Sequence, residues 1–326
     1  MPATALAIVL PAYNEEAVLP ISLPRLEKLL DQMITDRLIT QASRLIFVDD
    51  GSKDRTWAMI EAAQAAHPRV TGVKLSRNFG HQRALLAGLA TAAPYFDAII
   101  SIDVDLQDDI NAIPKMVRAF QAGSDVVYGV RNDRHTDTAF KRGTASLFYG
   151  LMNKLGVRMI PNSADFRLLS QRALQTLLQF PEENLFLRAM VPLVGFPSST
   201  VAYARLPRPA GTSKYPLRKM LAFATDGITS FSSEPIHLVM DAGFLFVFIG
   251  LAAFIYSLVQ HGRGRVVPGW TSLFCSLWII GGALMIAISV LGEYIGKIYT
   301  EVKRRPRYII ETETVTATLP VRQEEK

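Results

Sequence analysis

The sequence predicts an α/β domain built on a mostly parallel sheet, followed by a hairpin of two membrane-spanning helices. Short β-favouring apolar runs recur through the first 130 residues, and stretches of helical composition, such as 56–66 and 82–93, separate them. This alternation is typical of βαβ units with helices on both faces of a sheet. Two long apolar runs after residue 235 indicate the hairpin.

Each predicted strand ends where polar residues begin. The strands cover residues 6–10, 44–49, 70–75, 97–102 and 125–130. The first four are followed in turn by PAYNEE, DDGSKD, SRNFGHQ and DVDLQDD. Ligands of such sheets bind at the carboxyl ends of the strands. We therefore expect these polar groups to gather at one edge of the sheet.

The strand at 97–102 is followed directly by a cluster of carboxylates. Asp103, Asp105 and Asp108 lie close together in the sequence, with Gln107 among them. Neighbouring carboxylates raise one another's pKa unless a cation or hydrogen-bond donors offset their repulsion. Hard oxygen ligands at this spacing suit Mg²⁺ or Mn²⁺, which complete their shells with substrate phosphate. The cluster predicts a metal that holds a diphosphate; the alternative is an acidic surface turn.

Composition narrows the classes of partner and fold. The net charge of +6 over 326 residues is modest, and part of it flanks the apolar runs. It fits anionic lipid headgroups or phosphorylated substrates, and no aromatic and basic platform for nucleic acid is present. The single Cys275 excludes a disulfide framework and a cysteine-based zinc site.

The predicted hairpin occupies residues 236–296, with spans at about 236–260 and 270–292. Each run approaches or exceeds the roughly 20 residues that a helix needs to cross a bilayer. The second run carries no charged residue, and the linker between the two is short. The alternative is a buried pair of helices in a soluble core.

The basic residues around the spans predict their orientation. They precede the first span and follow the second in greater number than they occur in the linker: Arg218 and Lys219 before, Arg263 and Arg265 between, and Lys297, Lys303, Arg304, Arg305 and Arg307 after. The positive-inside rule then places both flanks in the cytoplasm. The N-terminus lacks the pattern of a signal peptide. We expect domain 1–211 and the basic tail 297–326 to be cytosolic, and the tail to fray after Ile310.

Two further stretches have an apolar helical face. Residues 212–235 place apolar side chains at steps of three and four residues, with Lys214, Arg218 and Lys219 near the start. Residues 139–154 are the second candidate. Both are predicted to lie on an anionic membrane surface. An ordinary amphipathic helix packed on the sheet is the alternative.

Three motifs, at successive strand ends, resemble a known signature. They are PAYNEE at 11–16, VDDGS at 48–52 and DVDLQ at 103–107, and together they resemble family 2 glycosyltransferases with the GT-A fold. The stretches 129–131, 163–168 and 211–215, placed before a two-span hairpin, are similar to the polyprenyl-phosphate glycosyltransferases. That group includes dolichol-phosphate mannose synthases and bacterial enzymes that charge undecaprenyl phosphate. The resemblance extends to about Ile310.

The resemblance implies a donor site for a nucleoside diphosphate sugar, with UDP-sugars favoured. The residues implied to bind the nucleotide sugar are Pro11, Tyr13, Glu15, Asp49, Asp50, Val104, Gln107, Arg205 and Lys214. Asp49 could instead cap the helix that begins near Asp54, and Asn14 could simply shape its turn. The assignment of Arg205 rests on spacing, and Arg208 is its alternative.

The resemblance also implies the catalytic and metal residues. Asp103, Asp105 and Gln107 would hold Mg²⁺ or Mn²⁺, which neutralises the charge of the leaving diphosphate. Asp103, Asp105 and Arg131 are the implied catalytic residues. Asp165 stands where many relatives have a small residue. It could contact a sugar hydroxyl or pair with Arg167.

Two motifs of polymer-building relatives are missing from this chain. They are a Glu-Asp dipeptide for the general base and a Gln-x-x-Arg-Trp sequence. A hydroxyl acceptor needs a base, whereas a phosphate monoester is already mostly dianionic at pH 7. The acceptor is therefore predicted to be a lipid phosphate, bound by Lys141, Arg142 and Ser146 with help from Arg131 and Lys214.

The resulting hypothesis is an inverting transfer of a hexose to polyprenyl phosphate at the cytoplasmic face of the bacterial inner membrane. Glucose from UDP-glucose is the leading donor by resemblance, followed by mannose from GDP-mannose or an amino sugar. The spans of this multi-pass protein would hold it at its lipid substrate and could assemble protomers. A synthase that uses a hydroxyl acceptor and a non-catalytic module that binds nucleotide sugars are the alternatives.

Overall fold

The computed structural model describes residues 3–132, 160–183, 185–204 and 270–315, with scattered positions between 236 and 263. The chain divides into two compact units. The first comprises residues 1–149, 158–215 and 305–326, and the second comprises 150–157 and 216–304.

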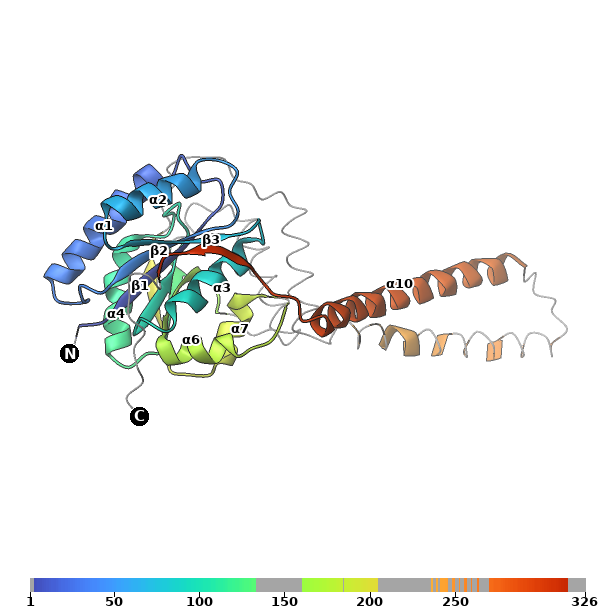
Figure 1. The fold of residues 1–326 in the computed structure, drawn as a ribbon. Coiled ribbons are helices and arrows are strands. Elements are labelled where there is room, and N and C mark those ends of the chain that lie inside the picture. The colour runs from blue at the N-terminus through green and yellow to red at the C-terminus, as the bar shows by residue number, and fades with distance from the viewer. Residues whose placement is uncertain are drawn as a thin grey trace. The chain divides into compact units, whose positions relative to one another are not determined.

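The first unit contains an eight-stranded sheet with the order β7-β5-β6-β4-β1-β2-β3-β8 (Figure 1). The strands are β1 Leu6–Ala12, β2 Arg44–Asp49, β3 Val70–Leu75, β4 Ala98–Ser101, β5 Val126–Arg131, β6 Ser163–Ser170, β7 Ser198–Tyr203 and β8 Ile310–Glu313. The helices are α1 Leu19–Thr35, α2 Thr56–Ala66, α3 His81–Ala92, α4 Ile113–Gln121, α6 Gln171–Leu178 and α7 Leu187–Leu193, with a 3-10 turn at Ile110–Ala112. The five strands predicted from the sequence are all present.

The central strands are parallel, as predicted. β1 pairs in parallel with β2 and β4, and β2 pairs in parallel with β3. Ala12 lies opposite Asp49 at one end of this register. The carboxyl ends of β1 to β4, with the polar sequences that follow them, therefore meet at one edge.

Helices cover both faces of the sheet because the strand side chains alternate between them. Leu6, Ile8 and Leu10 of β1 pack in one cluster with the buried residues of α1, α2 and α4. α3 lies on the other face, where a side chain at Gly88 would collide with Val9 and Val48. α6 and α7 lie on the same side as α3 in Figure 1. The core is thus a three-layer sandwich of helices, sheet and helices.

β6 interrupts the parallel order. It runs antiparallel between β4 and β5, with Ser101 opposite Arg167. This reversal brings the start of β6 to the edge where β4 ends, so Asp165 and Arg167 lie beside the loop that carries Asp103.

The outermost strand comes from the end of the chain. β8 pairs antiparallel with β3, placing Glu313 opposite Val73. Thr314 extends the contact, because its hydroxyl accepts from Gly72 N at 2.9 Å and its own N–H donates to Gly72 O at 3.1 Å. Val315 is fully buried. The expected fraying of the tail after Ile310 is therefore wrong for residues 310–315.

In the second unit, α10 spans Trp270–Val302. Residues Ile279–Val302 are long and apolar enough to cross a membrane, and none of the most apolar window is buried. Exposed side chains along the helix include Leu277, Met285 and Ile288. α10 contains the predicted second span. The first span at 236–260 lies largely outside the described residues, as do all of 212–235 and 139–154.

Candidate active site

The loops after β1 and β2 are joined by backbone and side-chain hydrogen bonds. Asn14 donates its N–H to Ser52 Oγ at 2.9 Å, and Asn14 Oδ1 accepts from Lys53 N at 2.8 Å. Glu15 N donates to Thr56 Oγ1 at 2.9 Å. Asn14 has a φ of +53°, a left-handed conformation that asparagine tolerates. The expectation that Asn14 shapes its turn is confirmed.

Asp49 is fully buried at the end of β2. Both of its carboxylate oxygens accept from Ser52 N at 3.3 Å. Burial raises the pKa of Asp49, and the hydrogen bonds from Ser52 oppose that shift. At the start of α2, Thr56 N donates to Asp54 and not to Asp49. Asp49 therefore fixes the turn after β2, and Asp54 binds the first turn of the helix. A direct contact from Asp49 to a nucleotide stays a prediction.

Asp50 holds the loop that leads into α3. Its two oxygens accept from Phe79 N at 2.7 Å and Gly80 N at 2.9 Å, and its side chain is buried. Gly51 beside it has a φ of +65°, and a Cβ there would lie 2.4 Å from the carbonyl carbon of Arg77. Only glycine permits this close approach. Asp50 thus has a structural role, and its contact with a base remains a prediction.

The loop after β1 presents two of its three predicted donor residues at the surface. Tyr13 and Glu15 are partly exposed, whereas Pro11 is buried within β1. Val104 is also buried, at 3% exposure. The Pro11 and Val104 side chains are therefore inaccessible to a ligand, whereas the Tyr13 and Glu15 side chains are partly accessible, and their contacts with a nucleotide stay a prediction.

The carboxylate loop turns sharply after β4. Leu106 has a φ of +47°, which is uncommon for a leucine and typical of strained functional loops. Half of the Asp103 side chain is exposed, while Asp105 is buried and accepts from Gln107 N at 3.3 Å. Enclosure by the protein and the charges of Asp165, Asp108 and Asp105 raise the pKa of Asp103, and His81 opposes them.

The donor set of this loop suits a metal that arrives with its substrate. In the described ranges, no group of three or more His, Cys, Asp or Glu side chains is arranged to hold a metal. Mg²⁺ is commonly bound through one or two carboxylates, with waters and phosphates completing its shell. Asp103 and Asp105, with the amide oxygen of Gln107, fit that chemistry.

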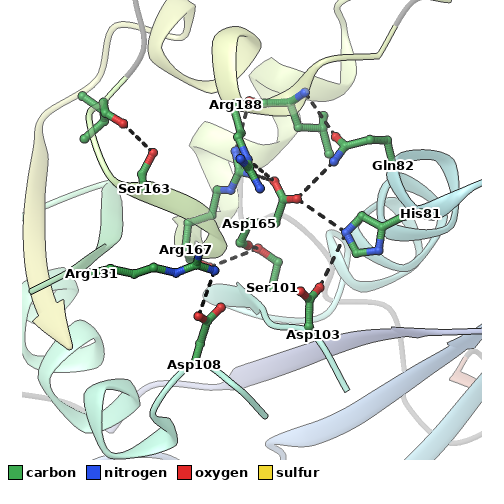
Figure 2. A network of polar contacts seen from close by, with 12 residues as sticks. His81, Gln82, Ser101, Asp103, Asp108, Arg131, Ser163, Asp165, Arg167 and Arg188 are labelled. Atoms are coloured by element: carbon green, nitrogen blue, oxygen red, sulfur yellow. Dashed lines mark hydrogen bonds and ion pairs between the residues drawn. The ribbon is translucent and has the colours of Figure 1, made fainter. Parts of the chain in front are cut away.

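Residues from three elements meet at Asp165 (Figure 2). His81 Nε2, at the start of α3, lies 3.5 Å from Asp165 Oδ2 and 3.6 Å from Asp103 Oδ1. Gln82 Nε2 donates to Asp165 Oδ2 at 3.1 Å. Arg188 Nε lies 3.5 Å from Asp165 Oδ1, which also accepts from the buried Arg167. The alternative in which Asp165 pairs with Arg167 is confirmed.

The charges in this cluster are mutually compensated. Burial opposes the protonation of His81, but the hydrogen bond to Asp165 and the charges of Asp103 and Asp165 outweigh it and raise the pKa of His81 to about 9. Burial would also raise the pKa of Asp165, yet Arg188, His81 and Arg167 hold it well below the usual range. An imidazolium therefore separates the carboxylates of Asp103 and Asp165 at neutral pH.

Arg131 closes the site on the β5 side. It donates from Nη2 to Asp108 Oδ1 and from Nε to the Tyr203 hydroxyl, both at 3.2 Å. Tyr203 in turn donates to Asp108 Oδ1 at 2.7 Å. The structure brings Arg131 to the same edge as Asp103 and Asp105, and its catalytic role stays a prediction.

Some predicted residues lie outside the described part of the chain. These are Arg205 and Lys214 of the donor set and the three lipid-phosphate residues Lys141, Arg142 and Ser146. Sequence reasoning, in turn, assigned no role to His81, Gln82, Arg188 or Tyr203. For His81 a signal was available, since SRNFGHQ follows a predicted strand and supplies an imidazole at the polar edge.

A comparison with family models decides the classification. Residues 7–178, from β1 through α6, match the model described as glycosyl transferase family 2. This chain is a member of glycosyl transferase family 2. The match includes all three motifs at the strand ends, and the expected family is confirmed.

Family 2 relatives cover nearly the full length of the chain. An uncharacterised glycosyltransferase of Bacillus subtilis, YkoT, is 49% identical over 322 residues, which is 98% of this chain and 96% of the relative. A bactoprenol glucosyl transferase of Shigella phage SfV is 39% identical, covering 94% of this chain and 98% of that protein. A prophage bactoprenol glucosyl transferase homologue of Escherichia coli K12 is 40% identical with the same two coverages.

Seen as a family 2 enzyme, the site divides into two sides. The joined loops after β1 and β2 form one side, where Tyr13 and Glu15 are partly exposed. The carboxylate loop, His81 and Arg131 form the other. The first side offers an aromatic face and an acceptor for a nucleoside, and the second offers carboxylates and cations for phosphates and a metal.

Proposed function

We propose that this glycosyltransferase moves glucose from UDP-glucose to a polyprenyl phosphate at the cytoplasmic face of the bacterial inner membrane. The observation that carries the proposal is full-length similarity to proteins named bactoprenol glucosyl transferase, at 38–40% identity over 94% of this chain. The similarity extends over nearly the whole chain and is not confined to the catalytic domain.

The donor would lie along the edge that the four parallel strands form. Tyr13 and Glu15 would meet the nucleoside, with Asp49 and Asp50 fixing the loops beneath it. Asp103, Asp105 and Gln107 would hold Mg²⁺ or Mn²⁺ with the diphosphate. When bound, the metal neutralises negative charge on the departing diphosphate. His81 supplies a fixed positive charge beside Asp103, which offsets its repulsion from Asp165.

The reaction would be a single displacement at the anomeric carbon. An oxygen of the acceptor phosphate forms the new bond to this carbon as the bond to the diphosphate oxygen breaks, so the configuration inverts and UDP leaves. A phosphate dianion needs no proton removed. This agrees with the missing Glu-Asp dipeptide. The chain's task is to bring two anions together, for which Arg131, Lys141, Arg142, Ser146, Arg205 and Lys214 are the proposed contacts.

The path of the chain supports two membrane crossings. β7 ends at Tyr203 and β8 begins at Ile310, and both belong to one sheet. A folded sheet lies on one side of a membrane, so the chain between these strands crosses an even number of times. With α10 as one crossing, the second would lie between residues 204 and 270. The apolar run 236–260 is the proposed second span, and the basic flanks favour a cytoplasmic sheet.

The function is tested by supplying the purified full-length protein with undecaprenyl phosphate, Mg²⁺ or Mn²⁺, and one radiolabelled donor at a time. The donors are UDP-glucose, GDP-mannose and UDP-N-acetylglucosamine. We expect a labelled lipid that mild acid cleaves, formed fastest from UDP-glucose. Label appearing only with a lipid hydroxyl acceptor would replace this proposal with a glycolipid synthase, and no labelled product from any donor would refute transfer to lipid phosphate.

A further inference from the structure

Arg131, Asp108 and Tyr203 form a closed set of hydrogen bonds, which we call the Arg131 triad. Each of the three contacts each of the others, with the shortest bond, 2.7 Å, from the Tyr203 hydroxyl to Asp108. Asp108 and Tyr203 are buried, whereas 32% of the Arg131 side chain is exposed. Two buried side chains of the triad therefore hold a guanidinium that solvent can reach.

The triad uses only one edge of that guanidinium. An arginine can bind a pair of oxygens through its Nε and Nη2 edge or through its Nη1 and Nη2 edge. Nε and Nη2 are bound to Tyr203 and Asp108, and within the described ranges Nη1 has no hydrogen-bond partner. The second edge is thus left to bind two oxygens of a phosphate, in an orientation that the first edge sets.

Tyr203 is itself held rigidly. Its ring packs edge-to-face on Phe166 with centroids 5.2 Å apart, and its carbonyl accepts from Asn132 N at 2.9 Å. Burial and the charge of Asp108 raise the pKa of Tyr203, so the phenol stays a neutral donor. Its hydroxyl accepts from Arg131 Nε and donates to Asp108 Oδ1, so Tyr203 fixes the guanidinium and its carboxylate partner at the same time.

The position of the triad in the fold indicates which phosphate it serves. Asp108 ends the carboxylate loop, while Arg131 and Tyr203 lie opposite each other at the ends of β5 and β7. From Arg131 the chain continues into 133–159, which carries Lys141 and Arg142, the basic residues predicted to bind the lipid phosphate. The triad thus connects the carboxylate loop to the residue from which the predicted acceptor segment starts.

We propose that Tyr203 is a positioning residue that, together with Asp108, orients Arg131 toward the phosphate monoester of the lipid acceptor. This inference rests on the proposed function. It assigns to Tyr203 a role in acceptor affinity that is separable from donor binding, because neither Tyr203 nor Asp108 is among the residues of the nucleoside side.

The test compares Tyr203→Phe with Tyr128→Phe in the full-length protein in detergent. Tyr128 is a buried tyrosine of β5 whose hydroxyl is outside the triad. We expect Tyr203→Phe to raise the KM for undecaprenyl phosphate about tenfold, the effect of losing one buried hydrogen bond. The KM for UDP-glucose and the Kd for UDP, measured by calorimetry with Mn²⁺, should stay within about twofold of wild type. Tyr128→Phe should leave all three constants unchanged.

A second variant keeps the test informative if Tyr203→Phe folds poorly. Arg131→Lys retains the partly exposed charge but lacks the planar fork, so it should raise the KM for the lipid in the same selective way. Equal changes in both KM values, or a lower melting temperature with unchanged kinetics, would overturn the positioning role alone. A wild-type protein that forms no labelled lipid would instead overturn the proposed function beneath it.

Discussion

His81 Nε2 lies 3.6 Å from Asp103 Oδ1, so an imidazole from the first turn of α3 faces the half-exposed carboxylate of the loop after β4. The same nitrogen lies 3.5 Å from Asp165, whose position is fixed by Gln82 and Arg167. His81 therefore couples the half-exposed Asp103 to the fixed carboxylate of Asp165. Carboxylate partners of an imidazole orient metal-site histidines in a similar way; here the imidazole orients a carboxylate.

Replacing His81 should weaken donor use. His81→Ala removes the cation between Asp103 and Asp165, and their repulsion then turns Asp103 away from its working orientation. We expect kcat/KM for UDP-glucose to fall about tenfold, with His81→Gln intermediate because its amide can still donate. Arg83→Ala, in the same turn of α3, is the matched control and should keep wild-type kinetics. A fully active His81→Ala enzyme would rule out this role.

Asp105 should be indispensable for transfer and dispensable for folding. Asp105→Asn preserves the shape of a buried side chain but removes the charge that a divalent cation requires. We expect the initial rate to fall about a hundredfold or more, the scale of a lost metal contribution. Membrane fractionation should still recover the variant with the lipid fraction. Turnover close to the wild-type rate would exclude Asp105 as a metal ligand.

The docking of β8 should contribute measurably to stability. Thr314→Val deletes the hydroxyl that accepts from Gly72 N and contacts Gln64 Oε1 at 2.7 Å. The buried Gly72 N–H would lose this partner, at a cost of about 1–3 kcal/mol. We expect a lower melting temperature for the full-length protein in detergent, while Thr314→Ser, which keeps the hydroxyl, should lose much less. Equal melting temperatures for the valine and serine variants would show that the hydroxyl has no stabilising role.

Asp125 predicts how stability changes in acid. Its hydrogen bond from Arg172 lowers the pKa of Asp125 below the ordinary 3.8; burial opposes the shift and Ser170 adds to it. A group with a lowered folded-state pKa stabilises the fold above its unfolded pKa, and this stabilisation is lost as pH falls through the folded pKa. Wild type should therefore melt higher than Asp125→Asn at about pH 6, with the gap narrowing below pH 3.8. A gap independent of pH would contradict the assignment.

The sequence allowed most of the sheet to be predicted because its signals are local. Apolar runs such as 44–49 and 70–75 have the same bounds in the structure as in the prediction. The motifs also indicated the correct edge, since parallel strands bring their carboxyl ends together. For Asp165 the partner Arg167 was foreseeable, because residues two apart in a strand share a face.

Contacts between distant elements were beyond such reasoning. His81 and Asp165 meet only because β6 runs antiparallel beside β4, a pairing that no periodicity reveals. Tyr203 reaches Asp108 across 95 positions of sequence. The structural role of Asp50 comes from a hydrogen bond that it accepts from Phe79 N, 29 residues later in the chain. The tail after Ile310 was misjudged because its threonines and glutamates are polar, yet the largely exposed β8 is held by backbone pairing with β3 and by the buried Val315 that follows it.

β8 also sets an order of events during synthesis. It follows α10 in the chain, so the ribosome completes the apolar helix before it makes the last strand of the sheet. Until that point, β3 is an open edge whose backbone groups can pair with other chains. The nascent domain therefore keeps an unprotected edge while α10 is being synthesised, and it closes that edge with the last residues of the sheet to leave the ribosome.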